Sequence, residues 1–419
     1  MINDLEKKIF NVKQSSRNLT MLSSQQRVNS LELLAKKLLS NKHSIIQVNN
    51  EELKIASQNG LDAHILDRMK ITEETINRMV ESLNNVKELP DSVSEIIDSK
   101  IRDNGLIVNK VRVPLGVLGV IFESRPNVVI EIASLSIKSG NALVMRGGSD
   151  SIKTNLFLFD LVKESLDESG FPKNSMYFID FVDRKAVDLL LSMDKYIDLL
   201  IPRGSSSLVN LVNQNAKMPS ITGGVGVCHT YIDKKADINQ AIKIIDNAKT
   251  QNPSVCNALD TVIIHKDILN QIIEPLAQAL LIKNVKIKAD QNSYKSIKNF
   301  KGVQLASKED FGEEFLGLKL SIKTVKNLEE ALDHISTYGS KHSEAIITDD
   351  ISSAKYFLEK VDAAAVFHNT STRFNDGFEL GLGAEVAVST DKLHARGPMG
   401  INDLMTYKWV ISGNGQLRK

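Results

Sequence analysis

Residues 117–127 of the chain read VLGVIFESRPN, and this stretch decides the fold class. Its first six residues form an apolar run typical of strands that are buried on both faces of a parallel sheet. Polar residues follow at once, and Pro126 stands where a helix can begin, because proline is tolerated at the first helical position. A buried strand that passes through a short polar loop into a helix predicts an α/β fold. In such folds ligands bind at the carboxyl ends of the strands.

The same alternation continues toward the C-terminus. Gly140 is predicted to end the first helix, since glycine favours the position after a helix. The next expected elements are strand 142–145, helix 155–169, strand 177–179, helix 184–192, strand 199–201 and a helix from Ser206. A second series starts near Cys228, with helix 238–248, strand 261–265, helix 267–282 and strand 285–288. Short apolar strands that alternate with helices predict a parallel α/β sheet.

The two ends of the chain differ from this pattern. Roughly the first 100 residues are predicted to be helical, with a capping box at Ser23-x-x-Gln26 and apolar residues at helical spacing after it. Segments 106–108 and 111–113 resemble short strands, and so does the tail, 406–411. A lone terminal strand needs a partner strand, for which another subunit is a candidate.

Bulk composition excludes several classes of protein. The 419 residues are 42% hydrophobic and 25% charged, as in soluble proteins with two or three domains, and the net charge of +1 gives no field to attract nucleic acid or membranes. No apolar run approaches the ~20 residues of a membrane span, and the N-terminus lacks the apolar core of a signal peptide. The two cysteines form neither a disulfide framework nor a zinc spacing. We therefore expect a cytoplasmic protein with reduced thiols and no nucleic-acid or membrane partner.

Cys256 is the candidate nucleophile. It lies in the run QNPSVCNALD, residues 251–260, on a connection between an expected helix and an expected strand, where catalytic residues concentrate. The alternative is a buried structural cysteine, which is the more common fate of a single cysteine. That alternative is stronger for Cys228, which stands in an apolar run. His229 does not form a dyad with Cys228, because neighbours on a strand point to opposite faces.

Polar loops follow three of the expected strands. After residues 117–122, Asn127 can donate an amide N–H to a developing oxyanion and Arg125 can pair with a carboxylate, although a helix cap with a solvated arginine is the alternative. Residues 146–149, RGGS, and 202–207, PRGSSS, combine arginine and glycine as phosphate sites do. Two such loops suggest a nucleotide, but each is also an ordinary Gly-Ser turn, and neither is the usual dinucleotide fingerprint.

Three further features have both a functional and an ordinary interpretation. The glycine cluster 222–226 permits close backbone approach, which a plain turn explains equally well. The spacing of His334 and His342 does not place both rings on one helical face, so we expect no metal site. Arg373 and Arg396 are candidate anion binders, and surface solvation is their alternative.

Taken together, these motifs resemble the γ-glutamyl phosphate reductases (glutamate-5-semialdehyde dehydrogenases) within the aldehyde dehydrogenase superfamily, over essentially the whole chain. The most specific segment is 325–346, VKNLEEALDHISTYGSKHSEAI. The other matching segments are FESRPN at 122–127, NALDT at 257–261, GLGAEVA at 381–387 and HARGP at 394–398.

The resemblance implies an aldehyde dehydrogenase-like fold, with two doubly wound parallel-sheet domains and a β-flap used for oligomerisation. It implies an NADP-binding domain at 1–227, with a β-hairpin near 100–116 that contributes to the flap. It also implies a catalytic domain at 228–400 and a C-terminal oligomerisation strand at 401–419. The protein is therefore expected to form a homo-oligomer.

The resemblance also implies roles for individual residues. Cys256 is expected to be the nucleophile and Asn127 the oxyanion donor, and Glu314 is similar to the glutamate that contacts the nicotinamide ribose. The other residues expected beside NADP(H) are Arg146, Gly147, Arg203, Gly204, Ser205 and Gly224. From their charges, and not from the resemblance, Glu123 is expected to bind the substrate ammonium, and Arg125, Arg373 and Arg396 are expected to bind its anionic groups. An arginine directly after strand 142–145, where NAD-selective enzymes often carry an acidic residue, favours NADP.

One departure from related enzymes bears on the reaction. Hydrolytic aldehyde dehydrogenases carry a water-activating glutamate near the cysteine, but the matching loop here, 220–224, reads SITGG and has no carboxylate, with Thr222 nearest that position. This fits reduction of an acyl phosphate, because phosphate is itself a nucleophile and needs no such base. The implied reaction reduces L-glutamyl 5-phosphate with NADPH through a Cys256 thioester to glutamate-5-semialdehyde, the second step of proline biosynthesis.

Three rival hypotheses remain open at this point: a hydrolytic aldehyde dehydrogenase, a non-catalytic nucleotide-binding protein, and a reductase of another acyl phosphate. The labile acyl phosphate also suggests a transient complex with glutamate 5-kinase, which makes it.

Overall fold

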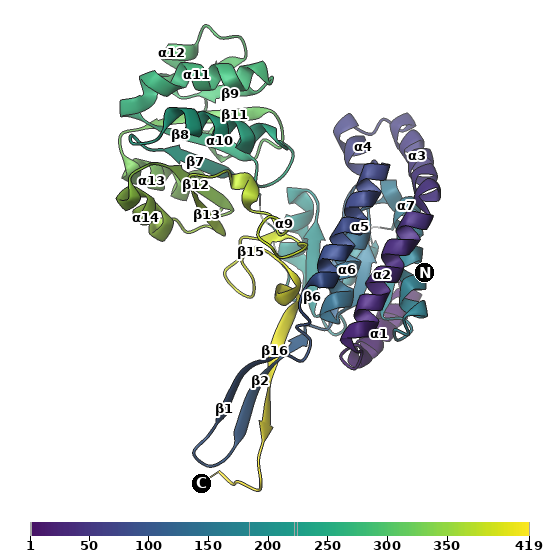
Figure 1. Cartoon of the computed structure of the whole chain (residues 1–419). Helices are drawn as coiled ribbons and strands as arrows, with labels where there is room; N and C mark the ends of the chain where they lie inside the picture. The colour runs from purple at the N-terminus through teal and green to yellow at the C-terminus, as the bar shows by residue number, and fades with distance from the viewer. Residues whose placement is uncertain (1, 184, 222, 224, 419) are drawn as a thin grey trace. The chain divides into compact units, whose positions relative to one another are not determined.

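The computed structural model describes residues 2–183, 185–221, 223 and 225–418. The chain forms two compact units (Figure 1). Unit 1 comprises Met1–Gly223, Gly381–Ala387 and Met399–Lys419, and unit 2 comprises Gly224–Leu380 and Val388–Pro398. In the described part of the chain, no helix is long and apolar enough to cross a bilayer. The roles predicted for 1–227, 228–400 and 401–419 remain predictions.

The N-terminal region of unit 1 is helical, as the sequence predicts. Its helices are α1 (Ile2–Leu19), α2 (Ser24–Ser40), α3 (Lys42–Gln58), α4 (Ala63–Met69) and α5 (Glu73–Glu88). The capping box is confirmed, because the Ser23 side chain accepts from the Gln26 backbone N–H and the Gln26 side chain accepts from the Ser23 N–H. Leu31, Leu34 and Leu38 form the buried face of α2.

The sheet of unit 1 is parallel and has the strand order β5-β4-β3-β6. Its strands are β3 (Val117–Phe122), β4 (Ala142–Arg146), β5 (Met176–Phe178) and β6 (Leu199–Arg203). The connecting helices are α6 (Val128–Ser139), η1 (Ser149–Ser151), α7 (Ile152–Glu168), α8 (Lys185–Leu191) and α9 (Ser206–Asn215). All six residues of β3 are buried, which confirms the interpretation of its apolar run.

The helix after β3 begins slightly later than predicted. The structure starts α6 at Val128 instead of Pro126, because the chain first passes through a turn in which Ser124 has a φ of 44°. Gly140 ends the same helix with a φ of 72°, the left-handed conformation that glycine adopts without steric cost.

A three-stranded antiparallel sheet also belongs to unit 1. It has the order β1-β2-β16, with β1 (Ile96–Ile101), β2 (Ile107–Pro114) and β16 (Met405–Ser412), which η5 (Ile401–Leu404) precedes. The two predicted strand pieces therefore form one continuous strand, β2. The terminal strand has a partner within the chain, because β16 pairs along its whole length with β2. β16 stands last in the strand order of this sheet, and pairing of the terminal strand with another subunit stays a prediction.

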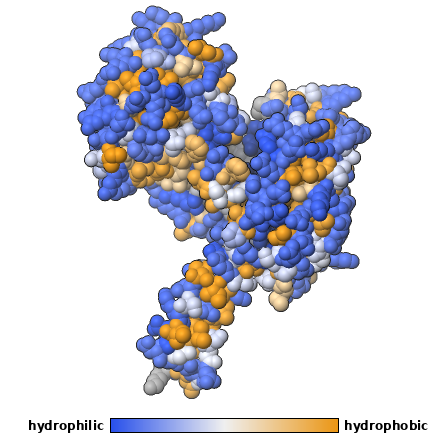
Figure 2. Space-filling model, in the orientation of Figure 1, coloured by the Kyte–Doolittle hydropathy of each residue, from blue (hydrophilic) through white to orange (hydrophobic). Residues whose placement is uncertain are grey.

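Several apolar side chains of this three-stranded sheet are exposed, and Figure 2 shows hydrophobic residues gathered on it. Ile101 is 76% exposed, Ile411 60% and Trp409 54%. Contiguous exposed apolar surface of this kind is typical of an interaction site.

Unit 2 contains a seven-stranded parallel sheet with the order β10-β9-β11-β8-β7-β12-β13. Its strands are β7 (Cys228–Ile232), β8 (Leu259–His265), β9 (Lys286–Ala289), β10 (Val303–Leu305), β11 (Lys319–Val325), β12 (Ser343–Ile347) and β13 (Ala365–His368). The helices are α10 (Ile238–Thr250), η2 (Lys266–Ile268), α11 (Leu269–Ile282), α12 (Gln291–Ile297), η3 (Glu309–Gly312), α13 (Leu328–Tyr338), α14 (Ile351–Lys360) and η4 (Thr372–Phe374). Two short strands, β14 (Val388–Ser389) and β15 (Gly397–Pro398), pair with each other.

Helices cover both faces of the seven-stranded sheet. Because side chains alternate along a strand, a strand can contribute residues to both of the resulting cores. Val262 and Ile264 of β8 belong to the core that includes helices α10 and α11, whereas Ile263 belongs to the core with α13 and α14. This doubly wound arrangement, together with the parallel sheet of unit 1, confirms the predicted fold class.

Candidate active site

Four segments that carry candidate residues of unit 2 precede neighbouring strands of its sheet. Glu314 precedes β11, Cys256 precedes β8, Gly226 precedes β7, and residues 340–342 precede β12. In the sheet these strands have the order β11-β8-β7-β12. The four segments therefore meet at the N-terminal ends of these strands, whereas ligand sites of α/β folds were expected at the C-terminal ends.

Gly226 lies directly against the backbone of the candidate nucleophile. A Cβ atom placed on Gly226 would lie 1.8 Å from the carbonyl oxygen of Cys256 and 2.8 Å from its Cα. The Gly226 N–H donates to Oε1 of Glu314 at 2.8 Å. Only glycine allows this approach, so the glycine at position 226 fixes the distance between the Cys256 loop and the Glu314 segment.

A chain of polar contacts supports the Cys256 loop from the core. The Cys228 thiol donates to the Cys256 carbonyl oxygen at 3.2 Å and lies 3.8 Å from Nδ1 of His342. The same Nδ1 is 2.8 Å from Oγ of Ser343, which accepts from Nδ2 of Asn375 at 2.8 Å. We call Cys228, His342, Ser343 and Asn375 the supporting chain.

The supporting chain closes on the residue after the nucleophile. The Asn257 side chain donates to the Asn375 carbonyl oxygen at 3.0 Å, and its own backbone carbonyl accepts from the Thr372 hydroxyl at 2.8 Å. Asn257 is buried, whereas Cys256 is half-buried. The buried, hydrogen-bonded Asn257 thus holds the loop in place, and Cys256 stands next to it in a half-buried position.

The two cysteines occupy different environments. Cys228 is fully buried, and burial raises the pKa of its thiol well above the usual value, with Asp260 and Glu344 adding to the effect. A thiol that is hard to ionise is a poor nucleophile. This supports the interpretation of Cys228 as structural. His229, its neighbour, contacts a different residue, with Nδ1 3.1 Å from the buried carboxyl of Glu344.

A buried ion pair lies behind the same loop. Lys249 at the end of α10 and Asp260 at the start of β8 are buried, with Nζ 3.5 Å from Oδ1. Burial raises the pKa of Asp260 to about 6 and lowers the pKa of Lys249. Asp260 also accepts from the backbone N–H groups of Cys228 and Phe315, so it ties the start of β7 to the Glu314 segment.

Lys249, Asp260 and Gly226 belong to this site, and their part in it was not predicted from the sequence. Opposite charges at the two ends of the Cys256 connection are the signal that could have revealed the ion pair. Gly226 was visible only as one glycine of a cluster.

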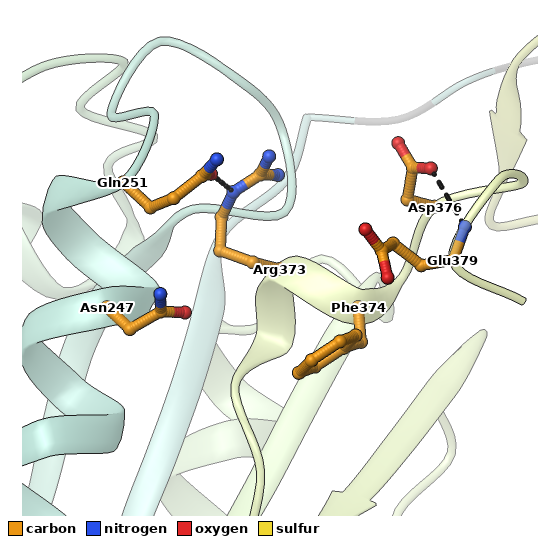
Figure 3. Close-up of a pocket in the computed structure, with 6 residues that line it drawn as sticks. All are labelled: Asn247, Gln251, Arg373, Phe374, Asp376 and Glu379. Atoms are coloured by element: carbon orange, nitrogen blue, oxygen red, sulfur yellow. Dashed lines mark hydrogen bonds between the residues drawn. The ribbon is translucent and has the colours of Figure 1, made fainter.

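Arg373 lies beside the nucleophile loop. Its Nε donates to Oε1 of Gln251 at 2.8 Å, and its Nη1 donates to Oδ1 of Asn257. Arg373 also lines a hollow with a volume of about 210 Å³ (Figure 3). The lining residues are Asn247, Gln251, Arg373, Phe374, Asp376 and Glu379. The arginine predicted to bind an anion is therefore placed next to Asn257.

Arg396 has a different environment from Arg373. One of its terminal nitrogens lies 2.8 Å from Asp362, which also pairs with Lys392 at 2.7 Å. Lys392 and Arg396 together hold the pKa of Asp362 at about 2. The structure gives Arg396 a carboxylate partner within the protein, and its predicted role in substrate binding stays a prediction.

In unit 1, the predicted cofactor residues lie at one edge of the sheet. Arg146 ends β4 and Arg203 ends β6, and the two strands flank β3. Both arginines are half-buried. Ser205 caps α9 by accepting from the Leu208 N–H, so a helix N-terminus opens at the same edge. Two arginines beside a helix N-terminus suit the phosphates of a nucleotide, and on this ground the residues fit a nucleotide cofactor.

The glycines of these loops lie close against neighbouring side chains. A Cβ on Gly147 would lie 2.4 Å from Nδ2 of the buried Asn155, and one on Gly204 would lie 2.4 Å from Oε2 of Glu123. Glu123 accepts from the Ser205 backbone N–H at 2.7 Å and contacts its hydroxyl at 3.3 Å. The carboxylate predicted to bind the substrate ammonium thus joins the loops after β3 and β6. Gly224 and Thr222 lie outside the described residues.

Asn127, the predicted oxyanion donor, stands at the N-terminus of α6. Its side-chain amide donates to Oε1 of Glu131 at 2.7 Å, which orients the amide. An amide nitrogen carries two hydrogens, so after one of them bonds to Glu131 the second can still serve as a donor to substrate. Arg125 is half-buried in the preceding turn.

The histidines of segment 325–346, His334 and His342, lie in the interior of unit 2. His334 packs against the rings of His229, Phe311 and Tyr338, with centroids 4.7–5.5 Å away. Burial lowers the pKa of His334 to about 3 and that of His229 to about 4, so both are neutral at pH 7. Among the described residues, no three His, Cys, Asp or Glu side chains gather as metal ligands.

Comparisons with known proteins identify the family of the chain. A sequence model of the aldehyde dehydrogenase family matches residues 3–297. The chain is 44% identical to the γ-glutamyl phosphate reductase of Francisella philomiragia, over 97% of this chain and 98% of that protein. It is 42% identical to the enzyme of that name from Caldicellulosiruptor saccharolyticus, over the full length of both. The crystal structure of γ-glutamyl phosphate reductase from Thermotoga maritima superposes with a TM-score of 0.94 at 36% identity, covering 99% of each chain.

Proposed function

Because the chain belongs to the γ-glutamyl phosphate reductase family of the aldehyde dehydrogenase superfamily, we propose that it reduces L-glutamyl 5-phosphate with NADPH. The products are L-glutamate 5-semialdehyde, phosphate and NADP⁺, in the second step of proline biosynthesis. The observation that carries the proposal is the Cys256 loop. Its cysteine is half-buried, its next residue, Asn257, is buried and hydrogen-bonded, and Gly226 lies against the backbone of Cys256.

The first chemical step is acyl transfer to Cys256. The thiolate attacks the acyl carbon of the substrate, a C–S bond forms, and the C–O bond to phosphate breaks. We assign oxyanion stabilisation to the Asn127 amide and the Cys256 backbone N–H, since loss of one such donor costs roughly 10²–10³ in rate. Residues 220–224 provide no carboxylate to activate water, which favours transfer between thioester and phosphate over hydrolysis.

Reduction of the thioester requires a hydride, which NADPH supplies when bound. We assign Arg146 and Arg203 to its phosphates and Glu314 to its nicotinamide ribose. Glu314 accepts from the Gly226 N–H, and Gly226 contacts the Cys256 backbone, so the ribose contact and the nucleophile would share one rigid support. Collapse of the hemithioacetal then releases the semialdehyde and regenerates the Cys256 thiolate.

The test is the reverse reaction of the purified protein. NADP⁺ reduction is followed with glutamate 5-semialdehyde, with and without phosphate, beside a Cys256→Ala variant. Turnover that requires both phosphate and Cys256 is expected. Equal turnover without phosphate would identify a hydrolytic dehydrogenase, and no turnover by folded protein would overturn the proposed reaction.

Two partner proposals accompany this function. The exposed apolar residues of the β1-β2-β16 sheet support a homo-oligomer in which this sheet contacts another copy of the chain. A transient complex with glutamate 5-kinase would protect the labile acyl phosphate, and a coupled rate that does not rise on mixing the two proteins would refute it.

We place the enzyme in the cytoplasm, where its two free cysteines stay reduced.

A further inference from the structure

One cation, Arg373, and two carboxylates, Asp376 and Glu379, line the same hollow. Figure 3 shows Arg373 between Gln251 and Asn247 on one side and Asp376 and Glu379 on the other. All these residues belong to unit 2. A cation and two carboxylates around a small hollow suit a zwitterion better than a simple anion.

The guanidinium group of Arg373 is held in a defined orientation. Gln251 accepts from its Nε and Asn257 accepts from its Nη1, and the two acceptors come from opposite ends of the Cys256 connection. A planar guanidinium fixed in this way is preorganised to bind a carboxylate with two parallel hydrogen bonds.

Asp376 places Glu379 on the far side of the hollow. Oδ1 of Asp376 accepts from the backbone N–H of Phe378 at 2.9 Å and from that of Glu379 at 3.3 Å. These bonds close a turn that holds the backbone of Glu379 beside the hollow. Glu379 is therefore the carboxylate available for a ligand, and Asp376 is a positioning residue.

The hollow is joined directly to the nucleophile loop. Asn257, which follows Cys256, donates to the backbone carbonyls of Arg373 and Asn375. In glutamate only two methylene groups separate the acyl carbon from the α-carbon. A glutamyl group attacked by Cys256 must therefore place its α-carboxylate and α-ammonium close to this loop.

We propose, on the basis of the reaction proposed above, that this hollow binds the amino-acid head group of the substrate. Arg373 pairs with the α-carboxylate and Glu379 with the α-ammonium. Glu379 thus replaces Glu123 as the ammonium ligand, since the Glu123 carboxylate holds Ser205 in unit 1. The pair selects substrates that carry both charges.

The experiment compares three aldehydes in the phosphate-dependent reverse reaction: glutamate semialdehyde, glutarate semialdehyde, which lacks the ammonium, and γ-aminobutyraldehyde, which lacks the carboxylate. For Glu379→Gln, kcat/KM should fall about 10-fold with the two amino aldehydes and stay unchanged with glutarate semialdehyde. Each aldehyde is compared only with itself across variants, so its cyclisation does not affect the ratios.

Arg373→Gln needs a ratio as its readout, because Arg373 also holds Asn257 beside the nucleophile. This variant should lower turnover of all three aldehydes, and should lower kcat/KM of the two carboxylate-bearing ones about 10-fold more than that of γ-aminobutyraldehyde. Glu359→Gln and Lys355→Gln, exposed changes on α14, are the matched charge controls and should alter no ratio.

The outcomes separate this inference from the reaction itself. Wild-type turnover that needs neither Cys256 nor phosphate refutes the proposed function. If wild type is active and Glu379→Gln lowers all three aldehydes equally or not at all, the ammonium site is refuted. An unchanged preference for carboxylate-bearing aldehydes in Arg373→Gln refutes the carboxylate site.

Discussion

Replacement of Gly226 by alanine should damage the chemistry far more than the fold. The added Cβ would lie 1.8 Å from the Cys256 carbonyl oxygen, 2.6 Å from the carbonyl carbon and 2.8 Å from Cα, where 3.4 Å begins ordinary contact. The two backbones must therefore separate by at least about 1 Å. No side-chain rotation can relieve the overlap, because every atom involved is main chain.

The displacement should appear mainly at Cys256. Glu314 accepts from the Gly226 N–H, and Oγ of Ser340 accepts from the Val227 N–H at 2.9 Å, so the 226–227 segment is held on its other side. A misplacement of about 1 Å can cost roughly 100-fold in rate. Overpacking of this kind costs about 1–3 kcal/mol of stability, which a two-unit protein can tolerate.

The assay is the phosphate-dependent rate of NADP⁺ reduction, with circular dichroism and a urea titration to establish folding. Gly226→Ala should lower kcat about 100-fold and retain the wild-type spectrum. Gly312→Ala is the matched control, since its Cβ would meet only a Tyr338 ring carbon at 3.7 Å, and it should keep wild-type activity. A folded Gly226→Ala protein with kcat within about 3-fold of wild type would refute the reasoning.

Three other substitutions test separate parts of the structure. His334 is neutral in the fold with a pKa of about 3, so its contribution to stability is complete above the unfolded pKa of about 6.5 and is lost as pH falls. His334→Phe should therefore make the unfolding free energy fall less steeply from pH 6.5 to 5, by up to about 1.4 kcal/mol per pH unit, and an identical slope in urea titrations would contradict this. Ser343→Ala breaks the supporting chain between His342 and Asn375, and should lower kcat about 10-fold with little change in KM, whereas the exposed Ser352→Ala should not. Trp409→Glu places a charge on the exposed β1-β2-β16 sheet and should yield a smaller oligomer in light scattering than Ile282→Glu, which changes an exposed apolar residue of unit 2. An unaltered mass for Trp409→Glu would argue against contact through this sheet.

Local sequence patterns predicted most of the secondary structure. The apolar run 117–122 became the fully buried β3, Gly140 ended α6 in the left-handed conformation, and Ser23 with Gln26 formed the capping box. Each of these signals acts within a few residues, through side-chain burial, backbone conformational freedom or a local hydrogen bond. The start of α6 was predicted less well, because Pro126 satisfies the rule for a first helical position while the left-handed Ser124 delays the helix.

Long-range pairing was harder to infer. The tail 406–411 was predicted as a strand, but its partner was not. The backbone N–H and C=O groups of a strand are the same in every sequence, so they do not indicate which distant segment will pair with it. The partner, β2, lies almost 300 residues earlier in the same chain. Exposed apolar side chains on the completed sheet, such as Ile101 and Trp409, became apparent only after that pairing was known.

The sequence by itself determined the fold class, the candidate nucleophile Cys256 and the family resemblance, since these depend on residue type and spacing. Only the tertiary structure decided what surrounds Cys256. Gly226, Cys228, Lys249 and Asp260 reach its loop because their strands and helices converge at one edge of the sheet. Arg373 and Glu379 become a head-group candidate because the chain after β13 returns to Asn257. The physical reason is that packing brings residues together whatever their separation along the chain, including Asn257 and Arg373, which are more than 100 positions apart. No local periodicity encodes which residues will meet.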